Sequence, residues 1–68
     1  VKRILYAPGR CRVGEIETPG AHDLPVKGAI IEEGEPLVTV LATHRSREDA
    51  ERLASGICSR VKEEIHYL

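Results

Sequence analysis

Large side chains are scarce in this sequence. It contains no Phe, Trp or Met, and Tyr6 and Tyr67 are its only aromatic residues. A hydrophobic core must therefore be assembled from Ile, Leu, Val and Ala. A chain of 68 residues buries only about 60% of the surface that it exposes when unfolded, so each of these residues matters to stability. The scarcity of aromatic residues also argues against a stacking platform for bases or sugars.

An excess of positive charge is absent as well. Ten Lys and Arg residues stand against eleven Asp and Glu residues, which gives a formal charge of -1. Proteins that bind nucleic acid without a partner rely on a basic surface, so we expect no nucleic acid partner. The longest uncharged run, 36–43, is far shorter than the roughly 20 apolar residues of a membrane span, so no membrane partner is expected.

Cysteine and histidine are few and widely spaced. Cys11 and Cys58 form no CxxC pair, and His22, His44 and His66 lie far apart in the sequence. This spacing indicates neither a zinc site nor a disulfide framework, so we predict no metal site and expect the histidines at the surface. In a cytoplasmic protein two isolated cysteines are usually buried, free thiols, and the alternative that the sequence leaves open is one disulfide between them.

Asn and Gln are both missing from the sequence, while Glu, Arg and Lys are abundant. Side-chain amides are thermolabile, and charged residues of these kinds increase in proteins from hot environments. The composition therefore favours a thermophilic source.

The first part of the chain, 1–45, is rich in β-prone residues. Turn residues divide it into four candidate strands: 1–7, 11–16, 27–31 and 37–42. Pro8 and Gly9 separate the first two strands, which we expect to pair as a hairpin, and 20–25 reads as a loop. The run 37–42 is apolar and β-branched on both faces, so we expect it to be covered on both sides.

The last part of the chain predicts one amphipathic helix over about 46–66. Ser46 is a suitable N-cap, and Glu48 and Asp49 suit the positive end of the helix dipole. Apolar residues then recur at spacings of three and four: Ala50, Leu53, Ala54, Ile57, Val61 and Ile65. Gly56 interrupts this helix at a cost of roughly 1 kcal/mol relative to Ala, which indicates close packing against a strand or a slight bend.

Three residues of this stripe, Leu53, Ile57 and Val61, are expected to dock on the strand that contains Val38 and Val40. Most charged residues of the helix fall off the stripe and are expected to face solvent: Glu48, Glu51, Arg52, Arg60, Lys62, Glu63 and Glu64. The sequence therefore predicts an α+β fold in one small domain over 1–68, with a mostly antiparallel sheet and one C-terminal helix.

Residues that carry chemistry are sparse. The turn Pro8-Gly9-Arg10 lacks the spacing of a phosphate-binding loop, and no nucleophile is accompanied by a base. The best candidate is an anion site at the helix N-terminus, formed by Arg45, Ser46 and Arg47. Ordinary capping by Ser46 explains the same residues, so no catalytic residue and no cofactor is assigned.

The segment 23–42, DLPVKGAIIEEGEPLVTVLA, resembles a recurring segment of ATP-grasp carboxylate ligases. The resemblance lies in the acidic-aliphatic-proline opening, the Gly-x-Pro turn and the Thr-Val strand. The run 3–7 is similar to the strand that enters the same small C-terminal domain, and the residues from Ser46 onward match its closing helix. Lys27 departs from the pattern, because the family often has a second proline there.

This resemblance implies a barrel-sandwich-like or rudimentary hybrid accessory domain that packs beside an ATP-grasp catalytic domain. Ligases of this family activate a carboxylate as an acyl phosphate with ATP and Mg²⁺. Their phosphate-binding lysines and acidic metal ligands belong to domains that would precede Val1, so none is carried over to this chain. The chain is therefore not expected to be an enzyme on its own.

Two other functions fit parts of the same pattern. One is a stand-alone module of the same fold that binds a protein partner. The other is a biotinyl or lipoyl carrier, since 31–42 looks like half of a carrier domain. A carrier needs a modifiable lysine directly after this strand, and the sequence has no lysine between Lys27 and Lys62. The carrier is therefore excluded, because His and Arg cannot form the amide link.

Overall fold

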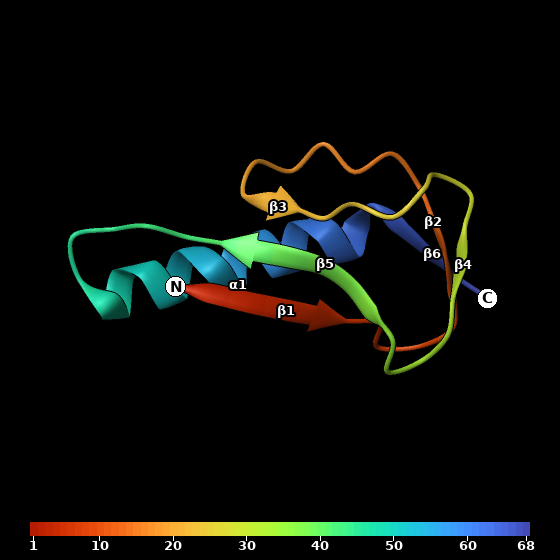
Figure 1. The fold of residues 1–68 in the computed structure, drawn as a ribbon, viewed down its shortest axis with the longest axis horizontal. Coiled ribbons are helices and arrows are strands. Elements are labelled where there is room, and N and C mark those ends of the chain that lie inside the picture. The colour runs from red at the N-terminus through yellow and green to blue at the C-terminus, as the bar shows by residue number, and fades with distance from the viewer.

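Six short strands form two antiparallel sheets, and one long helix packs against them. The computed structural model describes residues 1–68 (Figure 1). The first sheet has the order β1–β5–β3, with strands β1 (Lys2–Tyr6), β5 (Pro36–Leu41) and β3 (Ala21–His22). The second has the order β4–β2–β6, with strands β4 (Ile30–Ile31), β2 (Cys11–Val13) and β6 (Ile65–Tyr67). With helix α1 (Arg47–Glu63), this arrangement confirms the α+β fold class.

The first two strands do not form the expected hairpin. β1 pairs along its whole length with β5, whereas β2 pairs with β4 and β6 in the other sheet. Between them the backbone of Ala7 donates to the Glu35 carbonyl at 2.8 Å and accepts from the Gly34 N–H at 2.9 Å. These bonds hold the chain where it crosses from one sheet to the other. The longer strand β5 satisfies the hydrogen bonds of β1, so Pro8 and Gly9 connect two sheets.

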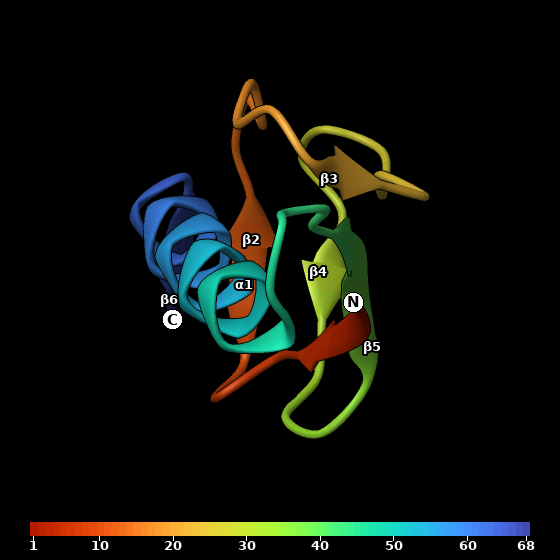
Figure 2. The ribbon, with the colours of Figure 1, turned by 90° about the vertical axis from the view of Figure 1, so that its left-hand side faces the viewer.

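The hydrophobic core lies between α1 and the two sheets. Figure 2 shows α1 on one side of the molecule and the β1–β5–β3 sheet on the other. The side chains that α1 buries are Ala50, Ala54, Ile57, Cys58 and Val61. All of them except Ala50 join Val38 and Val40 from β5 and Cys11 and Val13 from β2 in one cluster, and no polar side chain is buried. The predicted docking of Ile57 and Val61 in the core is confirmed.

The prediction that Leu53 docks with them is wrong. Its side chain is 44% exposed, and Cys58 occupies the buried stripe instead. The buried face of α1 is narrow, because the small side chains of Ala50 and Ala54 let the helix lie close to the sheets. Leu53 lies beside this buried face on the helix surface, at the margin of the core.

The helix also ends earlier than predicted. Its last helical residue is Glu63, and Ile65 begins β6, which pairs with β2 through Val13. The Gly14 N–H donates to the Glu64 carbonyl at 3.1 Å. A Cβ at Gly14 would lie 2.6 Å from that oxygen. Position 14 therefore requires glycine, because the backbone that follows the helix passes close to it. The sequence did not indicate this contact, because Ile65 also fits the helical spacing of the apolar residues.

Four further expectations change in detail. The second strand ends at Val13, and the third, β4, is reduced to Ile30–Ile31. The expected loop 20–25 contains β3, which pairs with β5 because Gly20, at φ 92°, turns the chain toward that strand. Gly56 is not packed against a strand, since a Cβ there would meet no atom within 4 Å. No helix of the structure has the length and apolar character needed to cross a membrane.

Candidate functional site

The three residues of the predicted anion site lie together at the start of α1. Arg45, Ser46 and Arg47 line one open hollow of about 440 Å³, together with Lys2 and His44. The hollow forms where the chain leaves β5 and enters the helix, so the N-terminal end of β1 supplies its opposite wall.

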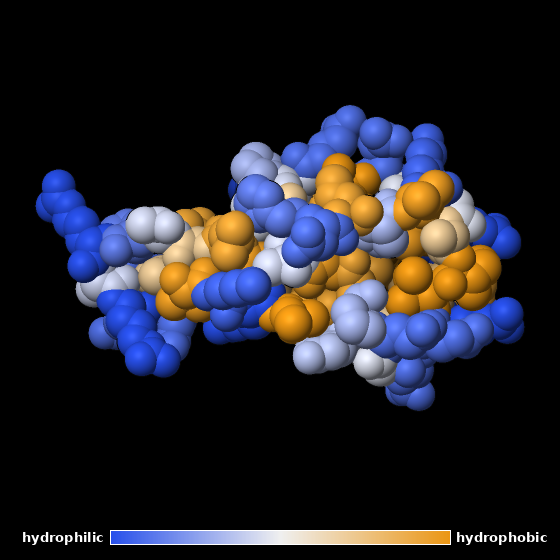
Figure 3. Space-filling view, viewed as in Figure 1, coloured by the Kyte–Doolittle hydropathy of each residue, from blue (hydrophilic) through white to orange (hydrophobic).

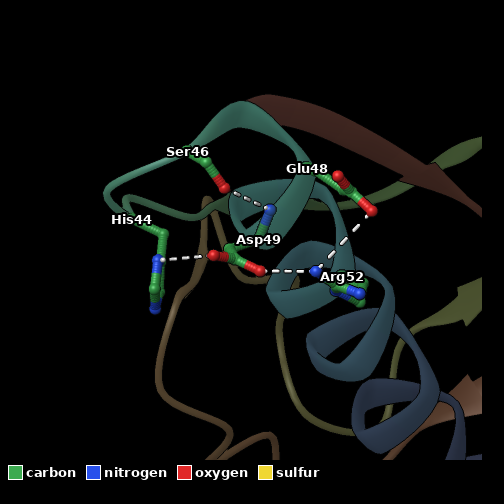
Figure 4. A network of polar contacts seen from close by, with 5 residues as sticks. All are labelled: His44, Ser46, Glu48, Asp49 and Arg52. Carbon is green, nitrogen blue, oxygen red and sulfur yellow. Dashed lines mark hydrogen bonds and ion pairs between the residues drawn. The ribbon is translucent and has the colours of Figure 1, made fainter.

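The helix N-terminus in this hollow is already capped. Ser46 has an extended backbone, and its Oγ accepts a hydrogen bond from the Asp49 N–H at 3.1 Å, which confirms the predicted N-cap. The Asp49 carboxylate lies 3.5 Å from His44 Nδ1 and 2.5 Å from Arg52 Nη2 (Figure 4). A second carboxylate, that of Glu48, lies 3.7 Å from the same Arg52 nitrogen.

These contacts limit what the hollow can bind. Arg47 pairs with Glu51 at 3.3 Å, while Arg45 makes no hydrogen bond or ion pair. An anion would have to compete with the acidic side chains Glu48 and Asp49 for the field of the helix dipole. The structure therefore brings the three predicted residues together, but it leaves only Arg45 among them as an unpaired cation.

A second surface was not predicted as a site. It is the outer face of the β1–β5–β3 sheet, which we call the open sheet face and define by Ile4, Tyr6, Thr39 and Leu41. Ile4 lies opposite Thr39 in the register of β1 and β5, and Leu41 lies opposite Lys2. Side chains two residues apart on a strand share one face, so these residues form one continuous surface.

The open sheet face is apolar and exposed. Ile4 is 43%, Tyr6 52% and Leu41 43% exposed. α1 packs on the opposite side of this sheet, as Figure 2 shows, so no element of the chain covers these side chains. In Figure 3, viewed from the side on which β1 and β5 lie in front, hydrophobic residues gather across the middle of the molecule between hydrophilic margins. At the margins lie Lys2, and His22 opposite Thr39.

This exposure corrects the prediction for the strand 37–42. Leu37 and Val38 point to opposite faces and are both buried, so the start of the strand is covered on both sides as expected. Farther along, Val40 is buried but Leu41 is exposed, so the end of the strand is covered on one side only. The sequence did carry a signal for the face, because apolar residues occur at every position of the run 37–42 except Thr39. What it could not show is that the chain leaves one side of the strand uncovered at Leu41.

The cysteines and histidines lie where the sequence predicted. Cys11 and Cys58 are free thiols buried in the core, and burial raises the pKa of Cys11 above its ordinary value. The side chains of His22, His44 and His66 are exposed. No three His, Cys, Asp or Glu side chains are arranged to hold a metal ion.

One relative among the curated proteins matches part of the chain. It is the uncharacterized protein MJ0776 of Methanocaldococcus jannaschii, which is 43% identical over 42 residues. The aligned stretch covers 62% of this chain and 11% of the relative. The chain therefore matches a small part of a much longer protein. No protein family and no solved structure matches the chain.

Proposed function

We propose that this chain is a non-catalytic accessory domain similar to the C-terminal domain of ATP-grasp carboxylate-amine or carboxylate-thiol ligases. In this role it packs its open sheet face onto the catalytic body of the ligase and shapes the edge of its cleft. The proposal includes a cytoplasmic location, which the unpaired thiols of Cys11 and Cys58 support.

The observation that carries the proposal is the apolar character of the open sheet face. An antiparallel sheet with one face in water normally alternates apolar and polar residues, so that the wet face is polar. Here Ile4, Tyr6 and Leu41 place apolar side chains on the uncovered face. Contiguous apolar surface of this kind marks an interface with another domain or protein.

Two further observations support a partner that belongs to a larger enzyme. The similar stretch of the archaeal relative makes up 11% of its length, so a related segment exists within a much longer chain. The turn and strand pattern of 23–42 also resembles the small domain of ATP-grasp ligases. In such an assembly the ligase body supplies the ATP and Mg²⁺ site, and this chain supplies binding surface.

The test is to express the complete reading frame that encodes the chain and to compare it with the chain alone by hydroxyl-radical footprinting. Tyr6 lies on the open sheet face and Tyr67 lies on β6, and they are 52% and 56% exposed. We expect oxidation of Tyr6 to fall sharply in the longer protein while that of Tyr67 falls less. A longer protein with an ATP-grasp body in which Tyr6 stays as reactive as in the chain alone contradicts the proposed packing.

A matched pair of variants tests the same point by activity. In the longer protein, Leu41→Asp places a charge on the open sheet face, and His66→Asp places the same charge on an exposed strand residue elsewhere. Only Leu41→Asp is expected to lower ATP-dependent ligase activity. A reading frame that ends near Leu68 and encodes no ligase body would favour the stand-alone interaction module instead.

A further inference from the structure

The outward side of α1 carries a shallow notch that the proposed function does not use. We call it the helix notch and define it by its lining: Arg52, Leu53, Gly56, Ile57 and Arg60. Its volume is about 230 Å³. Small-molecule sites typically measure about 300–1,000 Å³, so the notch is of a size to receive a protein side chain.

Packing within the domain does not explain why Gly56 and Leu53 lie in the notch. Gly56 destabilises a helix interior relative to Ala, yet a Cβ at this position would meet no atom within 4 Å. Beside it, Leu53 is 44% exposed although it lies next to the buried Ile57. Gly56 has no side chain and therefore lets a second backbone approach the helix closely, and the exposed Leu53 beside it offers that backbone an apolar contact.

The rim of the notch is basic. Arg52 and Arg60 lie four residues before and after Gly56, and no carboxylate is among the lining residues. Arg52 contacts Asp49 and Glu48, while Arg60 makes no ion pair. An acidic group placed over the Arg60 end would therefore find a free guanidinium, whereas a basic group would be repelled.

The same charges limit how a second copy of this chain could bind. A parallel crossing of two α1 helices at Gly56 would set the unpaired Arg60 of each against its counterpart, which brings like charges together. An antiparallel crossing would set Arg60 against Arg52, whose charge Asp49 and Glu48 balance. A second copy could therefore bind in the antiparallel orientation alone.

We propose that the helix notch is a docking site for an acidic amphipathic helix of a partner protein. An aliphatic side chain of that helix rests on Gly56 beside Leu53, and carboxylates on the same face pair with Arg60 and the outer edge of Arg52. This is the helix-in-groove mode of recognition, with apolar anchors at helical spacing and charges at the rim. The inference stands on the notch and does not depend on a ligase body.

Two designed peptides of about 16 residues, or four helical turns, serve as probes. Both have Leu at spacings of three and four. One carries Glu at the flanking positions and the other carries Lys there. We expect the Glu peptide to bind the chain in fluorescence anisotropy at low salt and the Lys peptide not to bind. In ¹⁵N spectra of the chain, the Glu peptide should shift the amide signals of Leu53, Gly56 and Arg60.

Two pairs of variants locate the binding. Arg60→Glu removes the free guanidinium, and Lys62→Glu makes the same charge change at an exposed residue outside the notch. Gly56→Leu fills the notch, and Glu63→Leu adds a leucine elsewhere on the helix. We expect Arg60→Glu and Gly56→Leu each to weaken binding by roughly tenfold or more, with little change for the two controls. Circular dichroism verifies that all four variants keep their helix.

Three results would overturn the proposal. The first is equal binding of the Glu and Lys peptides, or no binding of either. The second is a loss of binding in Lys62→Glu as large as that in Arg60→Glu. The third is a dimer in sedimentation equilibrium that Gly56→Leu dissociates, because the notch would then be occupied by a second copy.

Discussion

The side-chain carboxylate of Glu64 accepts a hydrogen bond from the backbone N–H of Glu17 at 2.8 Å, although the two residues are 47 positions apart. The Thr18 hydroxyl donates to the other oxygen of the same carboxylate. Glu64 therefore ties the end of α1 to the loop between β2 and β3. The sequence placed Glu64 among the solvent-facing charges of the helix, which is wrong, because the side chain is half-buried and engaged.

The first prediction concerns acid stability. Burial raises the pKa of Glu64, but the hydrogen bonds from the Thr18 hydroxyl and from the Glu17 and Thr18 backbone outweigh it, so the folded pKa lies below the ordinary 4.5. A lowered folded pKa stabilises the fold above the ordinary value, and this contribution is lost as the pH falls through the folded pKa. Glu64→Gln should therefore cost more stability at about pH 7 than at about pH 3.

Denaturant melts at the two pH values measure this difference. Glu63→Gln is the control, because Glu63 is exposed on the adjacent helix position and makes no ion pair. A cost of Glu64→Gln that is the same at both pH values would mean that the carboxylate does not hold the loop.

The features that the sequence predicted correctly depend on residues that lie close together in the chain. The Ser46 cap, the helix from Arg47, the buried Val38 and Val40 and the buried cysteines all follow from neighbouring residues or from short periodic patterns. Each depends on interactions within a few positions, so the chain itself carries the information.

The features that the sequence did not predict depend on contacts between distant segments of the chain. The pairing of β1 with β5, the strand formed by Ile65 and the bond between Glu64 and Glu17 join residues far apart in the sequence. The candidate site shows the same division. The position of Arg45 beside the helix start was predictable, whereas the open sheet face depends on which side of β5 the helix covers.

Packing of α1 gives the second prediction. Ile57 is 7% exposed in the core, while Leu53 is 44% exposed. Ile57→Ala should cost about 2–5 kcal/mol through lost burial and a residual cavity, a large share of the stability of a domain this small. Leu53→Ala should cost clearly less. Urea melts of both variants test this, with Glu63→Ala, expected to change stability by less than about 0.5 kcal/mol, as control. Equal costs for Ile57→Ala and Leu53→Ala would contradict the orientation of α1, in which Ile57 faces the core and Leu53 does not.

Two glycines should respond to alanine with opposite signs. At Gly14 the new Cβ would lie 2.6 Å from the Glu64 carbonyl oxygen, so Gly14→Ala should destabilise the fold by roughly 1–3 kcal/mol. At Gly56 the new Cβ meets nothing within 4 Å, so Gly56→Ala should stabilise it by up to about 1 kcal/mol. Thermal unfolding of the two variants gives both signs. A destabilising Gly56→Ala would show that the helix is distorted there.

The buried thiols give the fourth prediction. Cys11 is fully buried and Cys58 is 7% exposed, and burial raises the pKa of Cys11. Because the thiolate is the reactive form, both side chains should resist alkylation in the folded protein. Two equivalents of a thiol reagent should react quickly in denaturant and slowly in its absence, as followed by mass spectrometry. Rapid reaction of one thiol in the native state would indicate local opening of the core.

The last prediction concerns the hollow at the start of α1. Arg47 is paired with Glu51, and Ser46 caps the Asp49 N–H, so Arg45 is the one unpaired cation of the predicted anion site. Tight nucleotide binding requires several phosphate contacts and carboxylates for Mg²⁺, which this hollow does not combine. Titration calorimetry of the chain with Mg·ATP should therefore give no micromolar binding. Arg45→Ala and Arg12→Ala provide the decisive comparison, since Arg12 is an exposed arginine on β2. A stoichiometric isotherm that disappears only in Arg45→Ala would make the hollow a nucleotide site.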